Sequence, residues 1–155
     1  MTDTVRERCC KGLLARLAVA AAAVGDGCVV QRNGAFAVDH YPTLMLVDRG
    51  EGFVTKVVGE QSGCIEYQAE VLVELHAAAA DSGALTALLD VMYLETLRAL
   101  AADRTLGGVA RDAVEVELAG SVPPESDSER EIAVNALTLR IDFSTTSDPT
   151  VVGPL

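Results

Sequence analysis

"IEYQAEVLVELH" (Ile65–His76) is the stretch that decides the fold. Apolar residues occupy every second position from Ile65 to Leu75, and Glu66, Glu70 and Glu74 stand among the positions between them. Alternation with a period of two predicts a long β-strand with one apolar and one mostly acidic face. A sheet with one covered and one wet face is typical of antiparallel pairing.

Helical patterns lie on both sides of this strand. Thr4 is followed three residues later by Glu7, which is a capping-box pattern, and apolar residues then recur every four positions, so we expect a helix from Thr4 to about residues 23–25. Leucines and a methionine at helical spacing predict a second helix over residues 83–102. Its apolar residues cover more of the circumference than one sheet face requires, which indicates a second buried side, as in an oligomer.

The remaining segments read as strands, turns and loops. A polar stretch with two prolines, "AGSVPPESDSER" (residues 119–130), is expected to be an exposed loop. Residues 1–146 are expected to form a single domain and residues 147–155 a flexible tail. The further strands are predicted at Cys28–Arg32, Thr43–Val47, Phe53–Val58, Val114–Leu118 and Ala133–Phe143.

The order of these elements sets the fold class. A helix comes first, then several strands, a second helix and two strands, so helices do not alternate with strands as a parallel doubly wound sheet requires. The sequence predicts an α+β fold, with a mostly antiparallel sheet, two helices packed on one face and a long β-hairpin.

Composition excludes several classes of partner. The net charge of −11 argues against nucleic-acid binding and disfavours an anionic membrane surface. Half of the residues are hydrophobic, and the apolar stretch Leu13–Val24 is too short to span a bilayer. Because Arg16 interrupts this stretch and helical periodicity explains it, we expect no targeting segment. The four cysteines form no CxxC motif and have no histidine at ligand spacing, so we expect reduced thiols, no metal and no cofactor.

The glycine pair in "ADRTLGGVARD" (residues 102–112) raises the question of a phosphate-binding loop. Such loops place glycines before a helix, whereas Gly107 and Gly108 follow one, so we interpret the pair, with Asp103, as a helix-to-strand turn. His40 and His76 have no Ser or Cys partner in a known motif, and no catalytic residue is predicted.

Two candidate contact surfaces remain. Glu66, Glu70 and Glu74 share one strand face, which is either solvated, turned to a basic partner or able to bind a hard cation. The hairpin around residues 49–63 carries Arg49, Phe53 and Lys56, and it is either a contact device for a neighbouring subunit or simply part of the sheet.

The whole layout resembles a known family. The first helix is followed by the strand "YPTLMLVD" (residues 41–48), the hairpin and the long alternating strand. The second helix ends in "DRTLGG" (residues 103–108), with an alternating strand after it, and "ALTLRIDFSTT" (residues 136–146) closes the pattern. Over residues 4 to about 146 the chain resembles the tail terminator (minor tail protein) family of long-tailed bacteriophages.

The resemblance implies a structural virion protein that is assembled in the host cytoplasm and has no enzymatic activity. It implies a hexameric ring that caps the finished tail tube, stops its polymerisation and offers a surface for joining the head. The partners would be copies of the chain, the tail tube protein and a head–tail connector protein. Two alternatives stay open: a head-completion or connector protein of the same particle, and a small cytosolic enzyme or ligand-binding domain.

Overall fold

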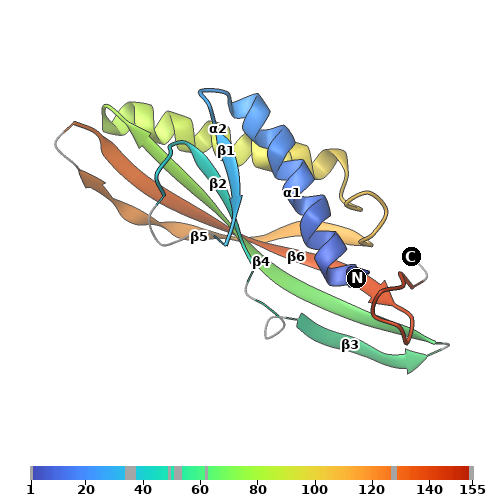
Figure 1. Cartoon of the computed structure of the whole chain (residues 1–155). Coiled ribbons are helices and arrows are strands. Elements are labelled where there is room, and N and C mark those ends of the chain that lie inside the picture. Colours follow the sequence, from blue (N-terminus) through green and yellow to red (C-terminus); the bar gives the residue numbers. More distant parts are fainter. Residues whose placement is uncertain are drawn as a thin grey trace.

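A computed structural model of the chain describes residues 2–33, 38–48, 50, 54–61, 63–126 and 129–153. Within these residues the chain forms two helices and a six-stranded sheet in the order α1, β1, β2, β3, β4, α2, β5, β6. Both helices lie on the same face of the sheet, and the two ends of the chain lie close together (Figure 1). The predicted α+β class is therefore confirmed.

Both helices begin at side-chain caps, and the sequence predicts the one at Thr4. In α1 (Val5–Val24) the Thr4 hydroxyl accepts a hydrogen bond from the backbone N–H of Glu7, and Gly25 ends the helix with a φ of 73°. In α2 (Ser82–Ala102) the Asp81 carboxylate accepts one from the backbone N–H of Ala84. Each cap satisfies an N–H group that the first turn leaves without an intrahelical partner.

The sheet consists of β1 (Val29–Arg32), β2 (Thr43–Val47), β3 (Val54–Gln61), β4 (Cys64–Ala79), β5 (Asp112–Ser126) and β6 (Glu131–Thr145). Its order is β1-β2-β4-β6-β5; the β1–β2 pair is parallel and the other pairs are antiparallel. β3 also pairs with β4, along the half of β4 that precedes the half paired with β2. The β3–β4 hairpin therefore extends away from the helices (Figure 1).

The core lies between the helices and the apolar face of the sheet. It is built from small and medium side chains, as expected for a chain without Trp. The largest fully buried side chains include Leu13, Leu17, Leu44, Leu46, Leu75, Met92, Leu137, Leu139 and Ile141. The predicted face of β4 is confirmed, because Val71, Val73 and Leu75 are buried.

The expected loop over residues 119–130 is wrong, since β5 continues through Ser126 and pairs with β6 as far as Ser126↔Glu131. β5 is an edge strand, where a proline removes no hydrogen bond from the interior of the sheet. The pairing has register shifts between Ala119 and Val122 and between Val122 and Glu125. Such bulges accommodate Pro123 and Pro124 without ending the strand.

The glycine pair turns the chain after α2. Leu106, Gly107 and Gly108 have φ values of 52°, 79° and 80°, a left-handed run that favours glycine. The Asp103 carboxylate accepts hydrogen bonds from the Thr105 hydroxyl and the Gly107 N–H, and these contacts lower its pKa. Leu106 is buried and touches α1 at Gly12, so the turn is part of the helix packing.

Candidate interaction surfaces

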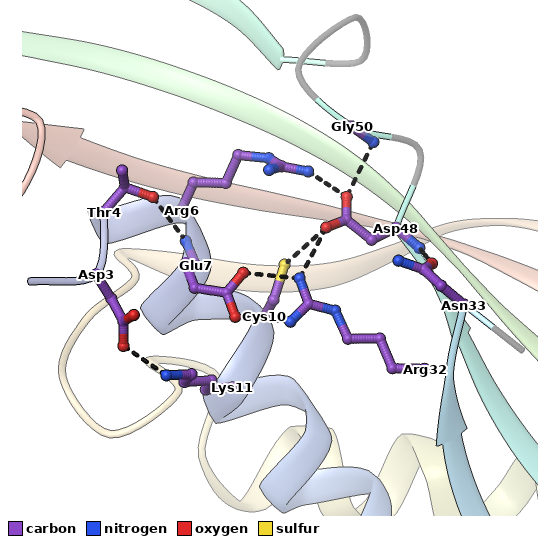
Figure 2. A network of polar contacts seen from close by, with 10 residues as sticks. All are labelled: Asp3, Thr4, Arg6, Glu7, Cys10, Lys11, Arg32, Asn33, Asp48 and Gly50. Atoms are coloured by element: carbon purple, nitrogen blue, oxygen red, sulfur yellow. Dashed lines mark hydrogen bonds and ion pairs between the residues drawn. The ribbon is translucent and has the colours of Figure 1, made fainter. Parts of the chain in front are cut away.

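A network of charged side chains joins the start of α1 to the ends of β1 and β2 (Figure 2). Asp48, directly after β2, forms ion pairs with Arg6 of α1 and Arg32 of β1, and its side chain is only 8% exposed. Arg32 also binds both carboxylate oxygens of Glu7, at 2.7 Å each. Paired, bidentate contacts of this kind fix the geometry of both partners.

Backbone groups complete the surroundings of Asp48. Its carboxylate accepts a hydrogen bond from the Gly50 N–H at 3.0 Å, and its own N–H donates to the side-chain oxygen of Asn33 at 2.7 Å. The Cys10 thiol lies 4.0 Å from the carboxylate. The network therefore ties three elements together through one buried acid.

The pKa values in the network follow from these contacts. Burial alone would raise the pKa of Asp48, but the Gly50 N–H, the Arg32 hydrogen bond and the two guanidinium charges lower it below its ordinary 3.8. The hydrogen bond from Arg32 lowers the pKa of Glu7. Burial, and then the charge of Asp48, raises the pKa of the Cys10 thiol to about 11, so this thiol stays protonated at neutral pH.

The three glutamates on β4 lie on the sheet face away from the helices, and partners from this same chain stand beside them. Glu66 forms an ion pair with Arg111 at 2.6 Å, and the Glu74 carboxylate lies 2.8 Å from the Nε2 atom of His76. Glu70 is exposed and lies directly opposite Arg140 of β6. Arginine side chains from the same chain thus stand beside Glu66 and opposite Glu70, so the row is not a purely acidic face.

Of the hairpin residues singled out in the sequence, Lys56 lies on β3 with an exposed side chain. Arg49 and Phe53 lie outside the described residues. In the described part of the sheet, β3 pairs with β4 on one edge only, so its second edge offers backbone groups for pairing with another chain.

The outer side of α2 exposes apolar side chains. Val91 is 42% and Leu94 45% exposed, and Val19 of α1 is 51% exposed. The helix buries Leu85, Leu89 and Met92 on its other side. The prediction that α2 has more apolar surface than the sheet covers agrees with this arrangement.

The two histidine side chains have separate partners. The Nε2 atom of His40 lies 2.8 Å from the carbonyl oxygen of Gly27, on the loop after α1. His76 is buried beside Glu74 near the end of β4. Among the described residues, no group of three His, Cys, Asp or Glu side chains is placed to hold a metal ion.

A hollow of about 310 Å³ lies between the start of α1, the β3–β4 hairpin and the end of the chain. Tyr67 and Phe143 stack in its wall with ring centroids 5.3 Å apart. Its other lining residues are Thr4, Arg6, Val54, Thr145 and Pro149. The lining mixes apolar and polar groups, and its one charged side chain, Arg6, is paired with Asp48.

The network around Asp48 is not predictable from the sequence. Its acidic and basic members are separated by 16 to 42 residues along the chain. The sequence offers one hint of the network, which is the oppositely charged pair Arg6 and Glu7 in the first turn of a helix whose other face is apolar. Without the register of β1 and β2, nothing in the sequence brings Arg32 and Asp48 to that turn.

In the described part of the chain, neither helix combines the length and apolar character needed to cross a membrane. Comparison of the sequence with models of known protein families and with curated proteins finds no match.

Proposed function

We propose that the chain is a structural subunit of a phage or phage-like particle. Copies of it assemble as a ring, a hexamer by resemblance to tail terminators, which caps the finished tail tube. The ring ends polymerisation of the tube protein and provides the surface to which a head–tail connector protein binds. The chain acts by shape and charge complementarity and performs no catalysis.

One observation carries the proposal: the molecule offers two unlike surfaces in different places. The outer side of α2 exposes Val91 and Leu94, while the β3–β4 hairpin projects beyond the helices with an unpaired β3 edge in the described residues (Figure 1). A closed ring requires contacts between two different patches, one on each neighbour. The sequence resemblance and the α+β fold agree with this use of the surfaces.

The charged side chains on the open sheet face support the same function. Glu66 and Arg111, and Glu70 and Arg140, place both signs of charge on this face. Complementary charges of this kind fix the register of a partner more than they add affinity. We assign this face, with Glu66, Glu70 and Glu74, and the hairpin, with Arg49, Phe53 and Lys56, to contacts with neighbouring copies or the tube.

The proposal is tested by the size and shape of the purified protein. Sedimentation velocity over a range of concentrations, with negative-stain imaging of the largest species, is expected to show closed rings. A strictly monomeric chain at every concentration, which also fails to bind isolated tail tubes, would contradict the proposal.

Substituting both Val91 and Leu94 with Asp is expected to weaken the ring. Charges placed in an apolar contact must be desolvated, so the dissociation constant should rise at least about tenfold, equivalent to about 1.4 kcal/mol. The free energy of unfolding of the monomer should change by less than about 1 kcal/mol for each substitution, because both side chains lie at the surface. Sedimentation and urea unfolding measure the two quantities separately.

The control is Asp26→Asn, at an exposed polar position in the turn after α1 and outside α2, which should leave the association unchanged. If the double variant associates as tightly as the unsubstituted protein, the outer side of α2 is not a ring contact.

A further inference from the structure

Residues 146–153 turn back after β6 and cover its end. The pairing of β5 with β6 stops at Asp142, so Phe143, Ser144 and Thr145 extend past β5. On that edge the N–H of Gly153 donates to the carbonyl oxygen of Ser144, and the N–H of Thr146 donates to that of Val151, both at 3.0 Å. The tail thus acts as a short strand where β5 is missing.

The same segment completes the start of α1. The N–H of Val5, in the first turn, donates to the carbonyl oxygen of Pro149 at 2.9 Å, and the Arg8 side chain donates to that of Thr150 at 3.2 Å. The first N–H groups of a helix have no partner within the helix. The tail therefore provides a hydrogen-bond acceptor for the first turn of α1.

The fit between the tail and its site is specific. A Cβ atom on Gly153 would lie 2.9 Å from the Ser144 hydroxyl and 3.0 Å from the Cys64 sulfur, so the site accepts only glycine without rearrangement. The side chain of Val152 packs against the main apolar cluster. The site thus recognises an extended segment with an apolar residue followed by glycine.

The turn that returns the tail is held by contacts within itself. The Asp148 carboxylate accepts hydrogen bonds from the N–H and hydroxyl of Thr150, and the Thr146 hydroxyl accepts one from the N–H of Asp148. Asp148 is exposed, so water can replace these bonds at small cost. Opening the turn leaves every contact between residues 149–153 and the body available to another copy.

We infer that the site at the end of β6 binds the tail of a neighbouring copy in the assembled ring. Residues 149–153 of one subunit then occupy the edge along Phe143–Thr145 of the next, with the contacts they make in the isolated chain. This inference rests on the proposed function, because it needs a neighbour. Exchange of an identical segment costs little because the same contacts form. Residues 146–148 link the end of β6 to the exchanged segment, and this linker spans about 14 Å from Thr145 to Pro149 when extended.

A disulfide can report which chain supplies the tail. Thr145 and Val152 form an isolated antiparallel bridge, and the two hydrogen bonds that flank it make them a non-hydrogen-bonded pair with close Cβ atoms. Cysteines at these two positions therefore suit a disulfide. The background carries Cys64→Ser, because the Cys64 sulfur lies beside Gly153.

The experiment compares a double variant, Thr145→Cys with Val152→Cys, with a mixture of the two single variants. After assembly and mild oxidation, the double variant is expected to give a ladder of covalent oligomers on a non-reducing gel, and the mixture covalent dimers. At concentrations where the protein is monomeric, the double variant should give an intrachain disulfide and the mixture should give none. Val151→Cys in place of Val152→Cys is the matched control, since this exposed neighbouring side chain points to the opposite side of the strand.

Two results would overturn the inference, and only one of them would also contradict the proposed function. Rings in which the double variant holds only intrachain disulfides contradict the exchange and leave the proposed function intact. A protein that forms no oligomer at any concentration, and no interchain disulfide, contradicts both.

Discussion

Replacing Asp48 with Ala is expected to lower the free energy of unfolding by about 3 kcal/mol. The change removes the acid that Arg6 and Arg32 share and leaves two guanidinium groups, each about one quarter exposed, close together without it. It also removes the acceptor of the Gly50 N–H. Breaking a buried ion pair costs 3 to 5 kcal/mol in general, and the partial exposure of the arginines places this case at about the lower end.

Asp48→Asn removes the charge of the side chain but keeps its size. The amide can still accept one hydrogen bond, so the free energy of unfolding should fall by about half as much as in Asp48→Ala. The pH dependence gives a second readout. The pKa values of Asp48 and Glu7 are lower in the folded protein than their ordinary 3.8 and 4.5, so their stabilisation is complete above about pH 5 and is lost as the pH falls through the folded values.

Urea unfolding at pH 7 and at pH values from 5 to 3 measures both effects. The unsubstituted protein should lose stability steeply below about pH 4.5, and Asp48→Asn should lose less over the same range because one of the two acids is gone. Equal acid sensitivity in the two proteins, or a loss below about 1 kcal/mol for Asp48→Ala at pH 7, would show that the network contributes little to the fold.

The second large effect is expected at Gly12, on the face of α1 that meets the turn after α2. A Cβ atom there would lie 2.8 Å from the carbonyl oxygen of Leu106 and 2.9 Å from its Cβ atom. Gly12→Val should therefore lower the free energy of unfolding by about 3 kcal/mol, the upper part of the range for overpacking. The backbone of Leu106 cannot move away easily, because Leu106, Gly107 and Gly108 hold a tight left-handed turn.

Helix propensity predicts the opposite sign for Gly12→Ala, a gain of about 1 kcal/mol. The contact with Leu106 is expected to outweigh that gain, so Gly12→Ala should be destabilising as well. Ala15→Val, at an exposed position one turn further along α1, is the control and should cost about 0.6 kcal/mol from propensity alone. A stabilising Gly12→Ala would mean that α1 and the turn are packed less closely than described.

Patterns that repeat along the chain were sufficient to predict most of the fold. Alternation from Ile65 to Leu75 predicts the central strand because most apolar residues on it meet the core, and Thr4 predicts the start of α1 through a contact three residues away. β5 was cut short because composition alone does not show that Pro123 and Pro124 lie on an edge strand, where prolines are tolerated. The position of a strand in the sheet depends on pairing with β6, which is a long-range property.

The candidate surfaces, like the fold, could be predicted from the sequence only in part. The spacing of Glu66, Glu70 and Glu74 shows that they share a face, but not that Arg111 and Arg140 reach the same face from other strands. The tail has no periodicity, and its contacts with Val5 and Ser144 are main-chain hydrogen bonds, which carry little sequence signal. The assembly role itself stays a prediction from resemblance and surface shape.

The most direct test of that role is the length of tails made with and without the chain. Particles that lack it are expected to carry tails of uneven and excessive length without heads, and adding the purified chain should restore uniform, headed tails with a ring at the tube end. Tails of normal, uniform length that join heads in its absence would contradict the account.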